Sequence, residues 1–517
     1  MTDTPKTPRR QKAQQKPTQG SHKGYKGHQG QQGLQGYVRL LQPRPVSTVQ
    51  GLSLSAPKSP LEIEEIVNEI VLYLDKRSLH CCVSVSRVFY RASIRVLWTS
   101  VHWKNFAHPD IFLSEFDRYG RYVVELHDNH NADLERIARI CTNLYELRLN
   151  WTSPTDEKLE DVVRSSPKIS FLSLYSCHFL STKGLLHIAR LSRLRRLELR
   201  NMVKMDEPSL VVLLKSCPLL EYLALEDVRL NRTALDSLGT TPLRITTLAL
   251  TRSSPTGSLV QGILNNSPNI KEMSLARNVH SFLSMDNLLP HQNVYRHLSN
   301  LNLESCKLIS SETILAIIQA SFELERVNLS GTHVGDEALE TLAVQCTKLT
   351  SLNIALCPII TDQGLLRALG NCRGLSFLDI STMDTLSAAI FKRDASWGCT
   401  DLETLIMTGI DMTQPMSPQR NHAMMFIQLS CLERLRDLTI GSASLELQLE
   451  AGLTKMEKLC NLESFRIQKL QSALEDDEVR WLIDAWPKLK RARFGSGSLS
   501  QPWLRYFRRQ RPQLALC

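Results

Sequence analysis

A hydrophobic pattern of the form LxxLxL recurs along most of the chain at nearly constant spacing. Its copies start at Leu144, Ile169, Leu194, Leu220, Ile245, Ile270, Leu298, Leu324, Leu349, Leu375, Leu402, Leu435, Leu462 and Leu489. Successive copies lie 25 to 28 residues apart, except after Leu402, where a step of 33 residues indicates an insertion. Such regular self-similarity predicts a stack of repeated structural units.

Each unit is expected to pair a short strand with a helix. Apolar residues alternate within LxxLxL, as in a strand, and the segments between copies, such as GDEALETLAVQC and TDQGLLRALGNC, place a capping residue before a helical apolar run. Stacked strands would form a concave parallel sheet, with the helices on the convex side. The period and motif are typical of leucine-rich repeats. We therefore predict an α/β leucine-rich-repeat solenoid of about 14 repeats over residues 121–495.

A different pattern precedes the repeats. Residues 59–104 predict three short helices, and a helix start is expected at Ser59 and Pro60. Apolar residues lie on more than one face of the first helix, so this unit is expected to complete its core on a neighbour or a partner. Residues 105–120 are expected to be a connector, and the basic, aromatic residues 496–517 a C-terminal cap or tail.

The charge of the chain is concentrated at one end. The chain has 517 residues and a net charge of +10. Residues 1–58, rich in Gln, Gly, Lys, Pro and Ser, carry +9 and are expected to be a disordered basic tail. The rest of the chain is close to neutral, which makes nucleic acid an unlikely partner. Without a signal peptide or a membrane-spanning run, an intracellular location in the cytoplasm, the nucleus or both is expected, with no membrane partner.

No constellation for catalysis stands out. The chain lacks the GxxxxGK[ST], HExxH and GxSxG motifs, and repeat arrays mostly bind rather than catalyse. The Cys81–Cys82 pair and the His127…His130 pair are weak candidates for a zinc site, and most other cysteines recur at two fixed positions of the repeat, as buried structural thiols do. The chain is therefore expected to be a non-enzyme without cofactor or metal.

Residues 59–104 resemble an F-box, and the repeats resemble the cysteine-containing leucine-rich repeats of F-box proteins. The resemblance rests on Pro60-Leu61-Glu62-Ile63, Ile66, Tyr73-Leu74, Leu79, Val85-Ser86-Arg87-Val88-Phe89 and Leu97-Trp98. The chain has Phe89 where the family usually has Trp, Ser86 where it has Cys, and Pro-Leu instead of Leu-Pro. The resemblance implies a substrate-recognition subunit of an SCF (Skp–cullin–F-box) E3 ubiquitin ligase, which serves ubiquitin-dependent protein catabolism without bond chemistry of its own.

The resemblance also suggests which residues bind partners. The residues expected to dock on a Skp-type adaptor, and through it on a cullin–RING ligase, are Pro60, Leu61, Ile63, Ile66, Leu74, Leu79, Val85, Phe89, Leu97 and Trp98. Ile70 and Val83 are expected to belong to the intramolecular core.

A further hypothesis concerns the unknown protein substrate. Strand periodicity points Phe171, Tyr175, Arg196, Glu198, Arg200, Tyr222 and Glu226 to the concave face, and aromatic residues and Arg most often anchor interfaces. Two alternatives are a repeat scaffold that does not engage the ligase and a repeat protein that binds RNA or DNA through its basic ends.

Overall fold

The computed structural model describes residues 59–517, with gaps at 104–108, 130–132, 152–153, 203–204, 229, 232–237, 254, 279–287, 289–293, 393–396, 472–473, 495–508, 510, 512, 514 and 517. The chain divides into two compact units, Met1–Leu97 and Trp98–Cys517. The predicted basic tail, residues 1–58, lies outside the described residues.

The first unit contains a short 3-10 turn and three helices: η1 (Pro60–Glu62), α2 (Glu64–Leu72), α3 (Lys76–Cys82) and α4 (Arg87–Leu97). Asp75 caps α3, because its carboxylate accepts a hydrogen bond of 2.7 Å from the backbone N–H of Ser78. Residues from all three helices form the core, namely Val67, Val71, Leu79 and Ala92, with Leu74, Val88, Phe89, Val96 and Leu97 packed against them.

The second unit is built around a 17-stranded parallel sheet. Its strands are β1 (Ser100–Trp103), β2 (Glu125–Asn129), β3 (Glu146–Asn150), β4 (Phe171–Tyr175), β5 (Arg196–Arg200), β7 (Tyr222–Glu226), β9 (Thr247–Thr251), β10 (Glu272–Ser274), β11 (Asn300–Asn302), β12 (Arg326–Asn328), β13 (Ser351–Asn353), β14 (Phe377–Asp379), β15 (Thr404–Thr408), β16 (Asp437–Gly441), β17 (Ser464–Ile467), β18 (Arg491–Phe494) and β19 (Ala515–Leu516). A separate two-stranded sheet joins β6 (Met205–Asp206) to β8 (Leu230–Asn231).

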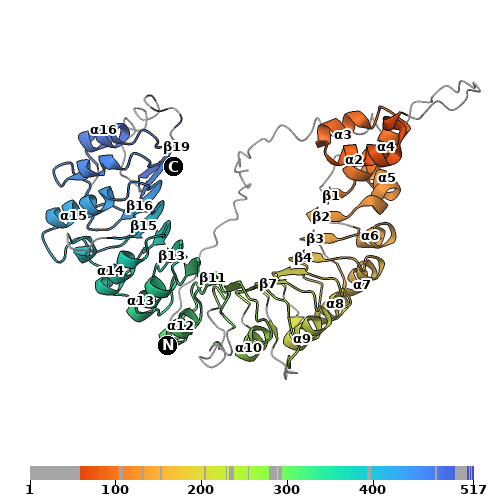
Figure 1. Cartoon of the computed structure of the whole chain (residues 1–517), viewed down its shortest axis with the longest axis horizontal. Helices are drawn as coiled ribbons and strands as arrows, with labels where there is room; N and C mark the ends of the chain where they lie inside the picture. Colours follow the sequence, from red (N-terminus) through yellow and green to blue (C-terminus); the bar gives the residue numbers. More distant parts are fainter. Residues whose placement is uncertain are drawn as a thin grey trace, which may run out of the picture. The chain divides into compact units, whose positions relative to one another are not determined.

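Helices follow most strands and lie on the opposite side of the sheet from its inner, strand-lined face (Figure 1). They are α5 (Pro109–Tyr119), α6 (Leu134–Ile140), α7 (Asp156–Ser165), α8 (Thr182–Ile188), α9 (Glu207–Ser216), α10 (Gly257–Asn265), α12 (Ser311–Gln319), α13 (Asp336–Gln345), α14 (Asp362–Asn371), α15 (Pro418–Ser430) and α16 (Asp476–Ala485), with the 3-10 turns η2 (Gly120–Tyr122), η3 (Ala388–Phe391) and η4 (Leu453–Lys458). In the described part of the chain, no helix has the length and apolar character needed to cross a membrane.

Every LxxLxL copy of the sequence forms one sheet strand, beginning two residues after its first apolar residue. Within a copy the pattern decides which side chains enter the core. Leu147 and Leu149 of β3 are fully buried, whereas Arg148 between them reaches solvent on the concave side. This inside–outside alternation recurs along the array, and the predicted α/β leucine-rich-repeat solenoid is confirmed.

The cysteines at the two fixed positions of the repeat are buried, as the sequence analysis predicts. Burial raises the pKa of the Cys141 and Cys217 thiols to about 12, because the low-dielectric interior disfavours the thiolate. The cysteines at these two positions are all free and buried: Cys141, Cys177, Cys217, Cys306, Cys346, Cys357, Cys372 and Cys399. They act as small packing residues.

The array begins earlier than the sequence pattern indicates. β1 pairs in parallel register with β2, Ser100 opposite Glu125, and α5 covers the same region. Residues 98–120, expected to be the end of the helical unit and a connector, therefore contribute a strand and a helix to the second unit. The pattern missed this repeat because β1, with the sequence SVHW, carries no leucine.

A left-handed backbone turn follows the strand in consecutive repeats. The residue seven positions after the first apolar residue has positive φ in the copies from Leu144 to Leu402, where it is Trp151, Ser176, Asn201, Asp227, Arg252, Arg277, Ser305, Gly331, Leu356, Thr382 and Gly409. The turn lets each backbone N–H donate to a carbonyl of the next repeat, as Trp151 does to Tyr175 at 2.8 Å. The bond between repeats offsets the strain of positive φ in residues with a Cβ.

Candidate protein-interaction surfaces

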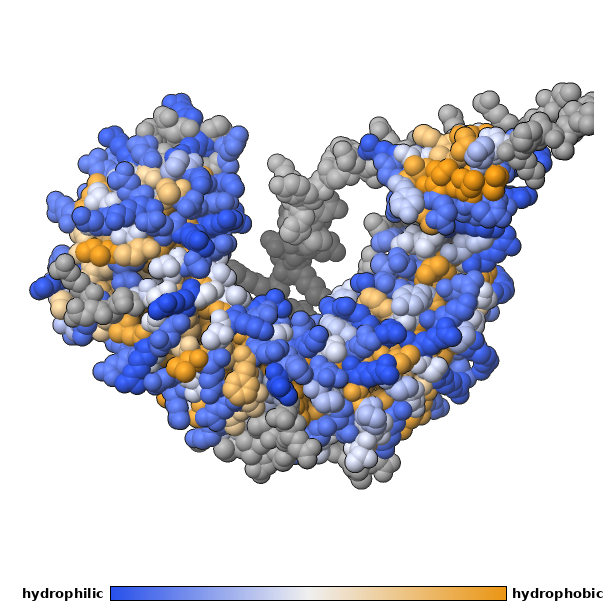
Figure 2. Space-filling model, in the orientation of Figure 1, coloured by the Kyte–Doolittle hydropathy of each residue, from blue (hydrophilic) through white to orange (hydrophobic). Residues whose placement is uncertain are grey.

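The helical unit exposes apolar side chains outside its own core. Leu61, Ile66, Leu72, Tyr73 and Val85 are exposed, with Val85 at 66% and Tyr73 at 87% of their full accessibility. Figure 2 shows hydrophobic side chains gathered over the helices of this unit. Because Val67 and Val71 supply the buried face of α2, the residues on its other faces remain available to a partner.

The residues predicted to dock on an adaptor fall into three groups by burial. Pro60, Leu61, Ile66 and Val85 are exposed, and Ile63, Leu74, Phe89 and Leu97 are partly buried, the last three against the core. Leu79 is a core residue and Trp98 is buried, so neither presents a side chain to a partner. Of the residues expected in the core, Val83 is buried and Ile70 is partly buried.

Trp98 corrects the predicted docking set, because it belongs to the core of the second unit. Its indole ring lies 6.2 Å from Phe112, 6.3 Å from Phe116 and 5.6 Å from Tyr119, measured between ring centroids. Aromatic rings at these separations attract one another beyond their simple burial. The sequence could not show this, since the partners lie in a segment expected to be a connector.

The concave residues predicted for substrate binding come together on β4, β5 and β7. Phe171, Arg196 and Tyr222 occupy one row, directly opposite one another in the parallel register. The Arg196 guanidinium carbon lies 3.9 Å from the Tyr222 ring centroid and 4.9 Å from that of Phe171, so the arginine is held between two aromatic faces. Burial, with the negative charge of Glu198, raises the pKa of the Tyr222 phenol above its ordinary value.

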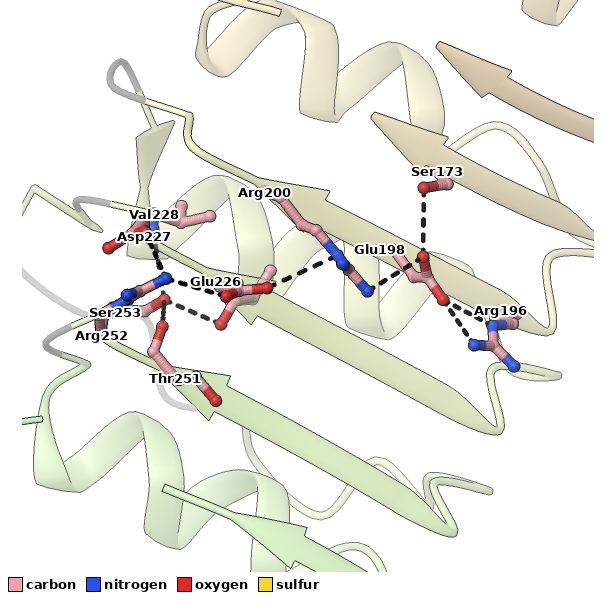
Figure 3. A network of polar contacts seen from close by, with 11 residues as sticks. Ser173, Arg196, Glu198, Arg200, Glu226, Asp227, Val228, Thr251, Arg252 and Ser253 are labelled. Atoms are coloured by element: carbon pink, nitrogen blue, oxygen red, sulfur yellow. Dashed lines mark hydrogen bonds and ion pairs between the residues drawn. The ribbon is translucent and has the colours of Figure 1, made fainter. Parts of the chain in front are cut away.

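Glu198 is buried beneath this row and organises its arginines (Figure 3). Its carboxylate accepts hydrogen bonds of 2.8 and 2.6 Å from Nε and Nη2 of Arg196 and one of 3.1 Å from the Ser173 hydroxyl. Arg200 lies 3.7 Å from the same carboxylate. Glu198 was predicted as a contact residue, but only 6% of its side chain is exposed, so it positions the two arginines instead.

A second polar cluster lies next to Arg200 and extends to Arg252, the residue that follows β9. Glu226 lies 3.7 Å from Arg200 and 2.9 Å from Arg252, and Arg252 also pairs with Asp227 at 2.8 Å (Figure 3). Each arginine here has at least one carboxylate, which keeps the surface close to neutral. A partner would therefore meet stacked rings and paired charges rather than a net charge.

The sequence analysis missed three concave residues. The Arg148 guanidinium carbon lies 4.4 Å from the Phe171 ring centroid, and the Trp151 ring stands edge-on to Tyr175 at 5.1 Å. Arg252 joins the cluster around Glu226. Arg148 belongs to the copy that starts at Leu144 and holds the same offset as Glu198, so extending the search by one repeat would have found it. Trp151 and Arg252 lie at the left-handed turn that follows the strand, a position that strand periodicity does not assign to the concave face.

Comparisons with known protein families also identify leucine-rich repeats in this chain. A family model described as the leucine-rich repeats of an FBD-associated F-box protein matches residues 138–247, and a leucine-rich-repeat model matches residues 321–343 and 345–367. A transport inhibitor response 1-like protein of Oryza sativa subsp. japonica is 27% identical over an alignment of 271 residues that covers 46% of this chain. The matched region spans about half (48%) of that curated relative. The chain is a leucine-rich-repeat protein.

Solved structures with similar folds share little sequence with it. A leucine-rich-repeat protein of Leptospira interrogans has a TM-score of 0.40 at 16% identity, over 77% of this chain and 90% of that one. An internalin of Listeria monocytogenes has a TM-score of 0.41 at 18% identity, over 74% and 89% of the two chains.

Proposed function

We propose that this chain is the substrate-recognition subunit of an SCF-type E3 ubiquitin ligase. In this proposal the helical unit docks on a Skp-type adaptor, and through it on a cullin–RING ligase. The repeats hold the protein to be ubiquitinated near the enzyme that carries ubiquitin. The chain itself makes and breaks no bond. Its contribution is to raise the effective concentration of substrate lysines at another subunit's active site, inside the cell.

One observation carries the docking half of the proposal. A unit of three short helices closes a small core with Val67, Val71, Leu79 and Ala92 and still leaves Leu61, Ile66 and Val85 exposed. Apolar side chains gathered on a small surface gain free energy when a partner covers them. The resemblance of residues 59–104 to an F-box, and the match of residues 138–247 to repeats described for an F-box protein, support an adaptor as that partner.

For the substrate half we propose the surface formed by Phe171, Tyr175, Arg196, Arg200, Tyr222 and Glu226, extended by Arg148 and Trp151. Arg196 is already stacked between two rings and hydrogen-bonded to Glu198, so little side-chain freedom is lost when a partner binds. Aromatic residues and Arg in such an arrangement are the usual anchors of protein interfaces.

The test is a pull-down of the purified full-length chain with a purified Skp-type adaptor. We expect the chain to bind the adaptor and a Leu61→Asp/Val85→Asp variant to lose binding, because both side chains are exposed and the charges would oppose burial. A matched Val344→Asp variant changes an equally exposed valine of α13 and should bind normally. Trp98 is unsuitable for this test because its replacement would disrupt the core of the repeats.

Failure of the unchanged chain to bind the adaptor would contradict the ligase role. The chain would then be better described as a leucine-rich-repeat interaction scaffold that does not engage the ligase.

A further inference from the structure

Arginine occurs on the sheet strands in two kinds of surroundings. Arg148, Arg196, Arg200, Arg326 and Arg491 each lie between 2.6 and 3.7 Å from a carboxylate, those of Glu146, Glu198, Glu198, Glu272 and Asp437 respectively. Arg466 of β17 and Arg493 of β18 differ, because no carboxylate of the described residues lies within 4.0 Å of either. These two charges on the concave side are not neutralised by the protein.

The two arginines are immediate neighbours. The parallel register pairs Arg466 with Arg493, and Thr439 of β16 precedes them in the same row. Adjacent strands are about 4.8 Å apart, and both arginine side chains are exposed on the same side of the sheet. Like charges placed directly opposite one another repel, so this pair costs stability unless an anion lies between them.

Two acidic residues on or beside the same strands already have basic partners. Asp437 pairs with Arg491 at 3.3 Å, and Glu463 pairs with Lys490 at 2.6 Å. The sequence contains no Asp or Glu after Asp484, and residues 1–58 carry a net charge of +9. Residues 1–58 and the residues after Asp484 therefore offer the arginines no acidic stretch, and a negative charge on a bound partner would neutralise them.

We propose that Arg466 and Arg493 form an anion site that takes a phosphorylated side chain of a protein segment bound along the concave face. A phosphate group carries close to two negative charges and three acceptor oxygens, which suit two forked guanidinium groups on neighbouring strands. The inference rests on the part of the proposed function in which the repeats bind a protein, and is independent of adaptor docking.

The extent of the basic surface favours a single phosphate over a nucleic acid. Thr439 is uncharged, and the neighbouring row of Asp437, Ser464 and Arg491 contains an ion pair. A nucleic-acid backbone presents a series of phosphates and needs a groove of positive charge along its path. Among the described strand residues, Arg466 and Arg493 are the arginines that have no carboxylate within 4.0 Å.

The test uses the full-length chain and a fluorescent Gly-Ser peptide that carries one phosphothreonine. We expect the chain to bind this peptide more tightly than its unphosphorylated form, with inorganic phosphate as a competitor. An Arg466→Ala/Arg493→Ala variant should bind the phosphopeptide at least about tenfold more weakly, because both charge-assisted contacts are lost. The matched Arg326→Ala variant removes an exposed strand arginine that pairs with Glu272, and should bind normally.

Several outcomes would overturn the site. The site is ruled out if the unchanged chain, at millimolar concentration, does not prefer the phosphopeptide to its unphosphorylated form. It is also ruled out if the double variant binds the phosphopeptide as well as the unchanged chain does. If an oligothymidylate binds more tightly than the phosphopeptide, and the double variant loses this binding as well, the ligand of the site would be a nucleic acid and not a protein segment. Because the arginines make no ion pair, the thermal midpoint of the variant should not fall, and an Arg466→Lys/Arg493→Lys variant should retain part of the binding.

The same variants separate this inference from adaptor docking. Both arginine variants should retain the adaptor in the pull-down described above. Loss of phosphopeptide binding with intact adaptor binding would support the anion site whatever the fate of the ligase proposal.

Discussion

Single residues on the concave face combine a structural role with the binding role proposed for them. Arg196 and Arg200 reach solvent, yet both also neutralise Glu198, whose side chain is 6% exposed. A buried carboxylate without partners costs far more than an exposed one, because its lost hydration is not replaced. We therefore expect substitutions in this patch to change the stability of the array, whatever their effect on the proposed binding.

We expect an Arg196→Ala/Arg200→Ala variant to lower the free energy of unfolding by about 1–3 kcal/mol, because Glu198 would remain buried with the Ser173 hydroxyl as its main partner. In a Glu198→Gln background the same replacement should cost less than about 1 kcal/mol, since no charge is left unpaired. Urea unfolding followed by circular dichroism measures both. Equal losses in the two backgrounds would show that Glu198 does not depend on these arginines.

At the scale of elements, helices of adjacent repeats are joined by a recurring carboxylate contact. Asp336, in the first turn of α13, accepts hydrogen bonds from the Thr361 backbone N–H at 2.8 Å and from its hydroxyl at 2.6 Å. Asp362 does the same with Ser387 at 2.9 and 2.7 Å. A Cβ at Gly364 would collide with the Asp336 carboxylate, which explains the glycine of the TDQG segment.

This contact also corrects the interpretation of GDEALETLAVQC as a simple capped helix start. The N-cap of α13 is Gly335, which has no side chain to accept a hydrogen bond, while Asp336 turns to the next repeat. Thr361 does cap its own helix, as predicted, by accepting from the Gly364 N–H.

We expect Asp336→Ala to lower the free energy of unfolding by about 1–2 kcal/mol, because two hydrogen bonds between repeats are lost. Glu337→Ala, which removes the neighbouring exposed carboxylate from the same first turn, should change it by less than about 0.5 kcal/mol. Thermal and urea unfolding of the two variants provide the measurement. Similar losses in both would mean that the effect comes from the helix dipole rather than from the contact with Thr361.

At the scale of the whole molecule, the charge is divided between the N-terminal segment and the rest. Residues 1–58 carry +9 of the net charge of +10. In the described residues most concave arginines are paired with carboxylates, which agrees with a repeat array that is close to neutral. We therefore expect non-specific attraction of polyanions to come mainly from the N-terminal segment.

We expect the full-length chain to bind single-stranded RNA weakly at low salt and a chain lacking residues 1–58 to lose most of that binding. The dependence of affinity on salt should flatten as well, because fewer counterions are released. A titration of labelled RNA at several salt concentrations measures both. Undiminished, salt-sensitive binding by the shortened chain would instead favour the nucleic-acid alternative for the repeats.

The sequence by itself determined the repeat fold. A period close to 25 residues and the alternation within LxxLxL suffice, because each repeat contacts mainly its neighbours and strand periodicity decides which side chains are buried. The repeat period and the strand alternation also predicted that the cysteines are buried and that Phe171, Arg196 and Tyr222 lie on the concave face.

Only the tertiary structure decided what depends on distant contacts. It buried Trp98 against an aromatic cluster of α5, buried Glu198 beneath two arginines, and gave the inner face of α2 to Val67 and Val71. It also showed which strand arginines have a carboxylate and left Arg466 and Arg493 without one among the described residues. These outcomes depend on side chains from different repeats or helices, and a pattern read along one chain does not contain such pairings.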